Sequence, residues 1–475
     1  MKNRLVTHTS LLIILIVAGC NIPQHTARNE NKNMPSGYTA NTADTTNIAL
    51  LNWRDYFNDD QLEALIDTAL RNNQELNIMI QEIEINRNEI RSRKGEYLPF
   101  LNLGSGAGFE KSGRYTRSGA VEEQLEIKPG KSFPEPLQDY MLGASASWEV
   151  DIWKKLRNAK QSAVMRYMAG VEGRNFMQTN LVAEIATSYY ELMALDNLLE
   201  IIQGNVIIQS NALNVVKQQK EAAKVSQLAV NRFEAQLLNT TNLEYSVKQR
   251  IVETENRIHY LTGKFPSGIN RNSSGFLNLT IDTLQTGIPA QLLTNRPDIR
   301  KAENELAAAR LDIKVAKAAF YPSLNIRAGM GFQAFNPAFL VNPESVIYNL
   351  AGDIMAPLLN RNAIMANYGN ANARQMQAVY TYEQSTLNAY VDVLNQLNKI
   401  QNYKGSFDTK KNEVDILVQS ITIANSLFNS ARADYMEVLL TQEEALKSKM
   451  ELVEIKLQQL QAKVGMYRAL GGGWR

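Results

Sequence analysis

The sequence predicts a membrane protein of mixed α and β class that is built from two copies of one structural unit. Three observations support this fold class. Four short segments alternate apolar with polar or small residues, as strands do. Two very long stretches contain no proline and carry apolar residues at helical spacing. The order of these segments is the same in both halves of the 475-residue chain.

The composition excludes several functional classes. Hydrophobic residues make up 44% of the chain, and 50 basic residues nearly balance 48 acidic ones. The mean hydropathy of −0.29 argues against a bundle of membrane-spanning helices. The charge balance gives no support for nucleic-acid binding. One cysteine and three histidines make a zinc site or a histidine-based catalytic centre improbable. We therefore expect no metal, no other cofactor and no enzymatic activity.

The first 19 residues predict a signal peptide. A basic start is followed by an apolar run over 11–17, which is too short to span a bilayer. The small residues that end it precede Cys20, the only cysteine, and this pattern resembles a bacterial lipoprotein signal. On that resemblance Cys20 receives a diacylglycerol and an acyl chain, and 20–50 is a lipidated polar linker. An ordinary signal peptide with an incidental cysteine is the alternative.

The rest of the chain divides into two structural repeats, 51–265 and 297–475, joined by an equatorial linker, 266–296. A shift of 223 residues superposes identical residues of the two repeats without a gap. The matched pairs include Glu82 with Glu305, Pro99 with Pro322 and Phe109 with Phe332. Because the unit is much longer than a solenoid repeat, the match indicates duplication of a whole module.

Each repeat begins with a helical stretch, 56–94 in the first and 297–318 in the second. Apolar residues recur there at helical spacing. A proline, Pro99 or Pro322, follows each stretch, where its ring and missing N–H prevent the helix from continuing.

Two strands follow in each repeat, and each has one apolar face. The predicted strands are 101–109, 140–150, 324–333 and 346–355. Each is close to the ~9–11 residues that a tilted strand needs to cross a bilayer. The alternative is a half-buried sheet in a soluble domain. The connecting loops 110–139 and 334–345 are polar or contain proline, which suits a position outside the cell.

Each repeat ends in a long helical hairpin. The first predicted hairpin pairs 154–224 with a return helix over 228–262, and the second pairs 360–431 with 436–470. Helices of this length are far above the average of about 11–12 residues. A dimeric coiled coil or a filament is the alternative, but the break in each rod favours hairpins.

Four strands cannot close a transmembrane barrel, because the sheet edges would leave backbone groups unsatisfied in lipid. Since the smallest single-chain barrels have ~8 strands, several copies must contribute. Three copies give a trimeric twelve-stranded β-barrel with four strands from each chain. The hairpins of the same three copies then continue it as a long periplasmic α-helical barrel.

Several motifs, in order along the chain, carry a resemblance to a known family. These motifs are Trp53–Phe57 with Leu62, Asp151–Trp153, Gly287–Glu303, Ala318–Ser323 and Tyr467–Trp474. Together they resemble the TolC-like outer-membrane efflux lipoproteins, also called the NodT family, which are the outer-membrane factors of RND-type tripartite pumps. The resemblance covers nearly all of 50–475.

The resemblance implies a homotrimer in outer-membrane lipid that extends into the periplasm. It implies a passive exit duct for drugs or other toxic small molecules, which docks a periplasmic adaptor (membrane fusion protein) and an inner-membrane RND-type pump. The duct of a type I protein-secretion system shares this architecture. A periplasmic coiled-coil scaffold that never inserts is a third possibility, and membrane fractionation separates it from a duct.

The tip of the second hairpin is the predicted pore gate. Related proteins carry a ring of acidic residues there, and three carboxylates around a narrow axis attract cations and repel anions. Glu437 matches one such position, with Asp434 and Glu443 as further candidates. Leu440 occupies the other position where the family often has aspartate. A hydrophobic constriction by Met436 or Leu440 is therefore the rival mechanism.

Both hairpin tips are candidate contacts for the adaptor. In the first tip these are Lys224, Val225 and Ser226, and in the second Arg432.

Two further motifs are better explained by structure than by chemistry. Pro297 followed by Asp298 predicts the start of a helix, and the glycines 471–473 predict the end of one.

Overall fold

The computed structural model describes residues 22–23, 28–38, 47–280, 286–357, 359–430 and 432–474. The predicted signal peptide and Cys20 lie outside these residues. The chain forms two compact units, each of which takes segments from both halves of the sequence. We call Glu84–Met168 with Asn304–Tyr380 the sheet unit. The helical unit consists of Glu30–Ile83, Ala169–Glu303 and Thr381–Arg475.

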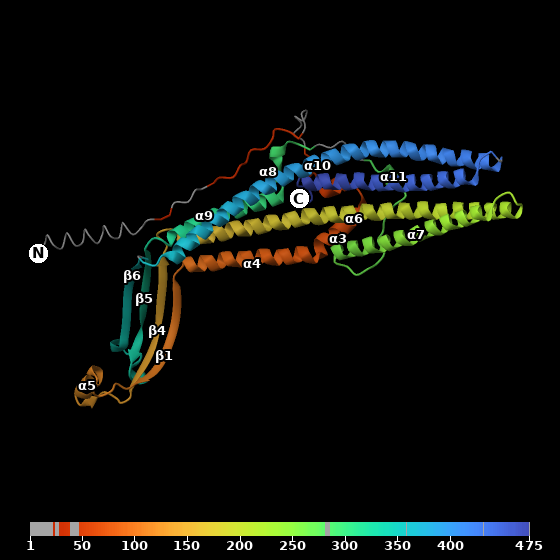
Figure 1. Ribbon diagram of the computed structural model, residues 1–475. Coiled ribbons are helices and arrows are strands. Elements are labelled where there is room, and N and C mark those ends of the chain that lie inside the picture. The colour runs from red at the N-terminus through yellow and green to blue at the C-terminus, as the bar shows by residue number, and fades with distance from the viewer. Residues whose placement is uncertain are drawn as a thin grey trace. The chain divides into compact units, whose positions relative to one another are not determined.

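The sheet unit contains a four-stranded antiparallel sheet in the order β1-β4-β5-β6 (Figure 1). Its strands are β1 (Phe100–Glu110), β4 (Leu137–Val150), β5 (Ser323–Ala334) and β6 (Val346–Met355). Each lies over one of the four segments that the alternation predicts. Strands β1 and β6 are the edges, and no described strand pairs with their outer sides.

The connection from β1 to β4 is more structured than the sequence indicates. It contains helix α5 (Arg117–Gln124) and a small hairpin of β2 (Glu126–Lys128) and β3 (Lys131–Ser132). Two ion pairs hold its ends together, since Lys111 and Arg114 both contact Glu135. This region was predicted only as a polar loop.

The first helical stretch is divided into three helices. They are α2 (Trp53–Phe57), α3 (Asp60–Asn72) and α4 (Gln74–Tyr97). Asn58 adopts a left-handed conformation after α2, and Asn73 is extended between α3 and α4. The Asn73 side chain accepts a hydrogen bond from the Leu76 amide at 2.9 Å. Hydropathy spacing did not reveal these breaks, because caps depend on single asparagines.

The two long hairpins are present as predicted, with bounds shifted by a few residues at most. The first pairs α6 (Lys155–Glu221) with α7 (Gln227–Thr262), and the second pairs α10 (Asn362–Asn429) with α11 (Tyr435–Ala469) (Figure 1). Polar contacts join the partners along their length. Gln203 on α6 donates to Glu244 on α7 at 3.0 Å, and Lys410 on α10 contacts Glu451 on α11 at 2.8 Å.

The second repeat starts and stops its helices where the sequence predicts. Helix α9 (Pro297–Ala318) begins at the predicted proline, with Asp298 in its first turn. Helix α11 ends at Ala469, and Gly471 then adopts a positive φ of 89°. A Cβ atom on Gly471 would lie 2.7 Å from the Asn295 carbonyl oxygen, so only glycine fits this close approach.

The largest hydrophobic core lies in the helical unit, where α2 and α3 pack against α6 and α11. Its fully buried members include Leu62 and Ile66 from α3, Tyr189 from α6 and Val453 from α11. A smaller core joins Tyr38 and Ile48 from the N-terminal region to α10 and the end of α11. Within the described ranges, none of the helices has the length and hydropathy needed to cross a bilayer.

Candidate functional site

The register of the four-stranded sheet places most of its large apolar side chains on one face. Leu103 on β1 lies opposite Ala144 on β4, which lies opposite Met330 on β5, and Met330 lies opposite Tyr348 on β6. Because side chains alternate along each strand, this pairing fixes the faces of all four strands at once.

We call this the apolar sheet face. It consists of Leu101, Leu103 and Phe109 on β1, Leu142 and Trp148 on β4, Leu324, Ile326, Met330 and Phe332 on β5, and Val346, Tyr348, Leu350 and Ile354 on β6, together with small residues between them. Many of these side chains are uncovered, and Leu103 and Tyr348 are 84% and 85% exposed. A surface of this kind requires an apolar environment.

The opposite face of the sheet is mostly polar or small, although a few apolar residues also lie on it: Phe100, Leu137, Met141, Ile347 and Met355. Arg327 and Asp353 face each other across β5 and β6 with their charged atoms 3.6 Å apart, and Gln333 donates to Asp139 at 2.9 Å. Glycines allow the strands to approach here, because a Cβ atom on Gly331 would lie 2.5 Å from the Leu142 carbonyl oxygen. One apolar and one polar face is the pattern of a transmembrane barrel strand.

Tryptophans lie at one end of the sheet and are tied to the backbone. The indole N–H of Trp148 donates to the Tyr97 carbonyl at 3.1 Å, and that of Trp153 donates to the Pro322 carbonyl at 2.7 Å. The Trp153 ring also stacks on Tyr321, with centroids 4.6 Å apart. Such aromatic residues are typical of the interface between lipid and water.

The tip of the first hairpin turns without glycine. Ala223 takes the left-handed position, with φ of 51°, and Ser226 caps α7 by accepting from the Ala229 amide. Lys224 and Ser226 are exposed, whereas Val225 is half-buried. Two of the three predicted adaptor contacts on this tip are therefore accessible in the protomer.

The two hairpin tips contact each other within one chain. The tip cluster, as we name it, has Leu213, Val216, Ala229, Val230, Phe233 and Leu439 as its buried members. Val225, Tyr435 and Met436 pack against it. An Arg232 guanidinium N–H also points at the Met436 sulfur at 3.3 Å. Met436, a predicted constriction residue, is thus engaged by the first hairpin.

The other predicted gate residues lie on the exposed side of the α11 tip. Asp434 precedes the helix, Glu437 is in its first turn, and both are exposed. Leu440 is 50% exposed, and Glu443 is exposed. Arg432, the predicted adaptor contact, is exposed as well, and its amide donates to the Leu427 carbonyl at 2.9 Å.

Helix geometry identifies Glu444 as an acid that the sequence analysis missed. Glu437, Leu440 and Glu444 follow each other at spacings of three and four, so they share one stripe of α11. All three are exposed. Glu443 lies at the margin of this stripe. The relevant signal, the i, i+3, i+7 spacing, was present in the sequence.

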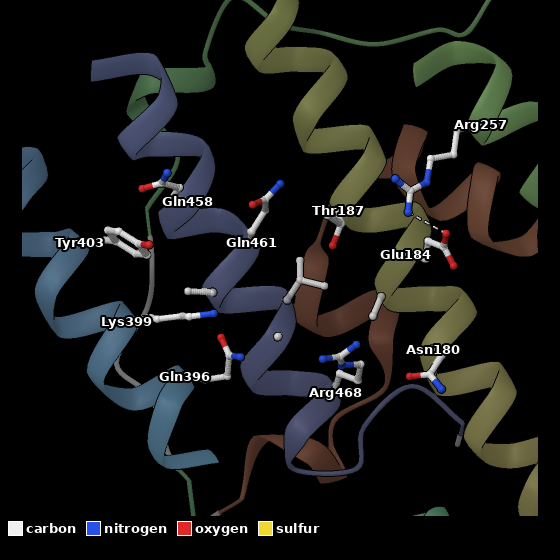
Figure 2. A pocket seen from close by; sticks show the side chains of 14 residues that line it. Asn180, Glu184, Thr187, Arg257, Gln396, Lys399, Tyr403, Gln458, Gln461 and Arg468 are labelled. Atoms are coloured by element: carbon white, nitrogen blue, oxygen red, sulfur yellow. Dashed lines mark hydrogen bonds and ion pairs between the residues drawn. The ribbon is translucent and has the colours of Figure 1, made fainter. Parts of the chain in front are cut away.

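The sequence analysis also missed a polar groove in the helical unit (Figure 2). It has a volume of about 690 Å³ and is lined by α6, α7, α10 and α11. The charged side chains in it are Glu184, Arg257, Lys399 and Arg468. Arg257 and Glu184 form an ion pair at 2.8 Å. No sequence motif predicts this groove, because its residues come from four helices that only the fold brings together.

The linker after α7 is fixed by charged side chains. Arg271 contacts Asp196 on α6 at 2.6 Å and Glu255 on α7 at 2.7 Å, and these contacts raise the pKa of its guanidinium. Further along, the ammonium group of Lys456 on α11 donates to the Leu279 carbonyl and lies 4.8 Å from the Phe407 ring centroid. Lys456 is buried, and burial lowers its pKa.

The described residues hold no group of three or more histidine, cysteine or acidic side chains that is arranged to bind a metal ion. The remaining sequence prediction, lipidation of Cys20, falls on a residue outside the described part of the chain.

Comparisons with known proteins agree on one family. The chain is 28% identical over 472 residues to the solvent efflux pump outer membrane protein SrpC of Pseudomonas putida, covering 98% of this chain and 97% of SrpC. It is 25% identical to the probable outer membrane lipoprotein SilC of Salmonella typhimurium, covering 98% of both proteins.

A solved structure shows the same fold. The open state of the MtrE outer membrane channel of Neisseria gonorrhoeae matches with a TM-score of 0.82 and 22% identity, over 96% of this chain and 98% of MtrE. The family described as outer membrane efflux protein matches residues 65–264 and 288–472. The first segment lies within the predicted repeat 51–265, and the second covers most of the predicted repeat 297–475 together with 288–296 of the predicted linker. The chain belongs to the outer membrane efflux protein family.

Proposed function

We propose that this chain is the trimeric exit duct of a tripartite efflux system, fixed in the outer membrane and extending into the periplasm. The apolar sheet face carries this proposal. A four-stranded sheet with one apolar face and two open edges is an incomplete barrel wall, and identical copies complete it edge to edge. Three copies supply twelve strands and, with their hairpins, twelve long helices.

The duct is passive in this proposal. An adaptor and an inner-membrane RND-type pump supply the energy. Lys224, Ser226 and Arg432, exposed at the two tips, are available to the adaptor. Glu437, with Asp434 and Glu443 nearby, forms the acidic part of the gate, and Leu440 interrupts it with an apolar ring.

Lipids on Cys20 anchor the mature N-terminus in the outer membrane. The alternative, a scaffold that never inserts, leaves the apolar sheet face in water, which is unfavourable at roughly 25 cal/mol for each Å² exposed. Substitution of Cys20 by alanine should abolish incorporation of labelled palmitate. A label retained in the Cys20→Ala protein would contradict this anchor.

Two measurements test the duct itself. The full-length protein purified in mild detergent should have the mass of three chains by light scattering after correction for detergent, and a stable monomer would overturn the proposal. Deletion of the gene should sensitise cells to drugs, detergents, solvents or metal ions, and a plasmid copy should restore resistance. Unchanged sensitivity to every compound, in cells lacking paralogues, would contradict efflux.

A further inference from the structure

The polar groove differs from the rest of the helical unit because it offers unused hydrogen-bonding and charged groups. Its lining includes the amides of Asn180, Gln396, Gln458 and Gln461. Within the described residues, none of these four amides makes a hydrogen bond to another protein group, and the same is true of the charged groups of Lys399 and Arg468. All four amides are half-buried.

The groove carries net positive charge. Arg257, Lys399 and Arg468 face one carboxylate, Glu184, so the lining has a net charge of +2. Figure 2 shows Lys399 reaching from α10 toward α11, while Arg257 turns to Glu184. Since the Arg257–Glu184 pair is satisfied internally, the excess charge belongs to Lys399 and Arg468.

Helix α11 forms the floor of the groove and has two distinct sides. Gln458, Gln461, Gly465 and Arg468 share one face at spacings of three and four. Gly465 has no side chain, and a Cβ atom there would lie 2.8 Å from the Gln396 amide. Glycine therefore leaves room for this amide to lie across the floor.

The opposite side of α11 is covered by other parts of the chain. Tyr467 stacks on Tyr56, and the Lys463 carbonyl accepts from the Tyr56 hydroxyl at 2.8 Å. Lys456, on the same side, contacts the Leu279 carbonyl. In the proposed duct the covered side of α11 would face outward, which would place the groove side toward the axis.

From this arrangement we infer that the polar groove is a lumenal binding site for organic anions in transit, with Arg468 and Lys399 as the groups that contact a carboxylate or sulfonate. This inference rests on the proposed duct, and it adds a class of cargo to it. Arginine pairs with such groups through two parallel hydrogen bonds, and the neighbouring amides select among anions by their remaining polar groups.

A fluorescent trisulfonated pyrene dye tests the site by direct binding. Fluorescence anisotropy should show the dye binding to the full-length trimer in detergent, at one site per chain and more weakly as KCl rises. The double variant Lys399→Gln, Arg468→Gln should weaken binding roughly tenfold or more, because both charged hydrogen-bond donors are lost. Arg468→Lys alone should retain part of the affinity.

Lys404→Gln is the matched control. Lys404 is an exposed lysine on α10 that does not line the groove, so this variant should change the affinity by less than about twofold. Equal binding by the wild type and the double variant, or no binding by the trimeric wild type, would overturn the anion site and leave the duct standing. A monomeric wild type would overturn both.

Discussion

Tyr467 of α11 lies flat against Tyr56 of α2, with ring centroids 4.2 Å apart and an angle of 12° between the planes. Each hydroxyl also binds backbone. Tyr467 donates to the Leu51 carbonyl at 2.6 Å, and Tyr56 donates to the Lys463 carbonyl at 2.8 Å. The pair therefore holds the start of the first repeat against the last helix of the chain.

Loss of this aromatic pair should destabilise the helical unit. Tyr467→Phe removes one hydrogen bond and should cost about 1 kcal/mol, while Tyr467→Ala removes a buried ring and should cost about 3–5 kcal/mol. Thermal unfolding of the detergent-solubilised protein measures both. Tyr245, an exposed tyrosine on α7, provides the control, and Tyr245→Phe should leave the midpoint unchanged. Equal midpoints for Tyr467→Ala and wild type would contradict the role of the pair.

Charge should be tolerated on only one face of the sheet. Leu103→Arg places a cation on the apolar sheet face and should cost about 2–4 kcal/mol at the middle of the bilayer. Asn102→Arg, one residue earlier on β1, places the same cation on the polar face. We expect Leu103→Arg to reduce the trimer recovered in the outer-membrane fraction and Asn102→Arg to spare it. If Asn102→Arg reduced the recovered trimer and Leu103→Arg spared it, the two faces of the sheet would be assigned wrongly.

Neutralising Glu437 should change the selectivity of the gate. Three carboxylates around the axis favour cations, so Glu437→Gln should lower the ratio of potassium to chloride permeability roughly twofold in planar bilayers. Glu454→Gln is the control, because Glu454 is an exposed acid farther along α11. If Glu437→Gln and wild type give the same reversal potential in a KCl gradient, the constriction is apolar and Leu440 becomes the residue to substitute.

Lys456 should make stability depend on pH. Burial lowers its folded-state pKa below the usual 10.5. At a pH between the folded-state and unfolded-state pKa values, the unfolded chain therefore binds more protons than the folded chain. Stability of the wild type should therefore rise with pH as 10.5 is approached. Lys456→Met removes this contribution.

The measurement is the difference in melting temperature between wild type and Lys456→Met from about pH 8 to pH 10.5. The melting temperature of the wild type should rise relative to that of Lys456→Met as the pH increases. Lys447→Met, at an exposed lysine of the same helix, should show no such trend. A difference that stays constant with pH would mean that Lys456 is not desolvated.

Periodicity predicted the long elements well for a physical reason. The strands must present one face to lipid, so β5 alternates without exception and β1 alternates over most of its length, and both are visible in the sequence. The hairpins must remain unbroken over many turns, so α6 and α10 lack proline. A structural constraint that acts on every residue of a segment produces a repeated pattern in the sequence, and such a pattern can be recognised.

Features that depend on single residues or on distant contacts were missed. The break at Asn73 rests on one side chain, and the hairpin of β2 and β3 is too short for a periodic signal. The contact of Arg232 with Met436 joins residues 204 positions apart, and the polar groove needs four helices at once. The repeat boundaries, the acidic gate and the adaptor contacts remain predictions.

The open edges of β1 and β6 have a genetic consequence. In the proposed trimer each barrel contains strands from three chains. A mutant chain that pairs normally through its strands but has a hairpin tip that keeps the channel closed would therefore inactivate each trimer that contains it. With equal expression of wild-type and blocked chains, only roughly one assembly in eight would be free of the defect. Tip mutations of this kind should behave as dominant-negative alleles, whereas alleles that damage an edge strand should be recessive.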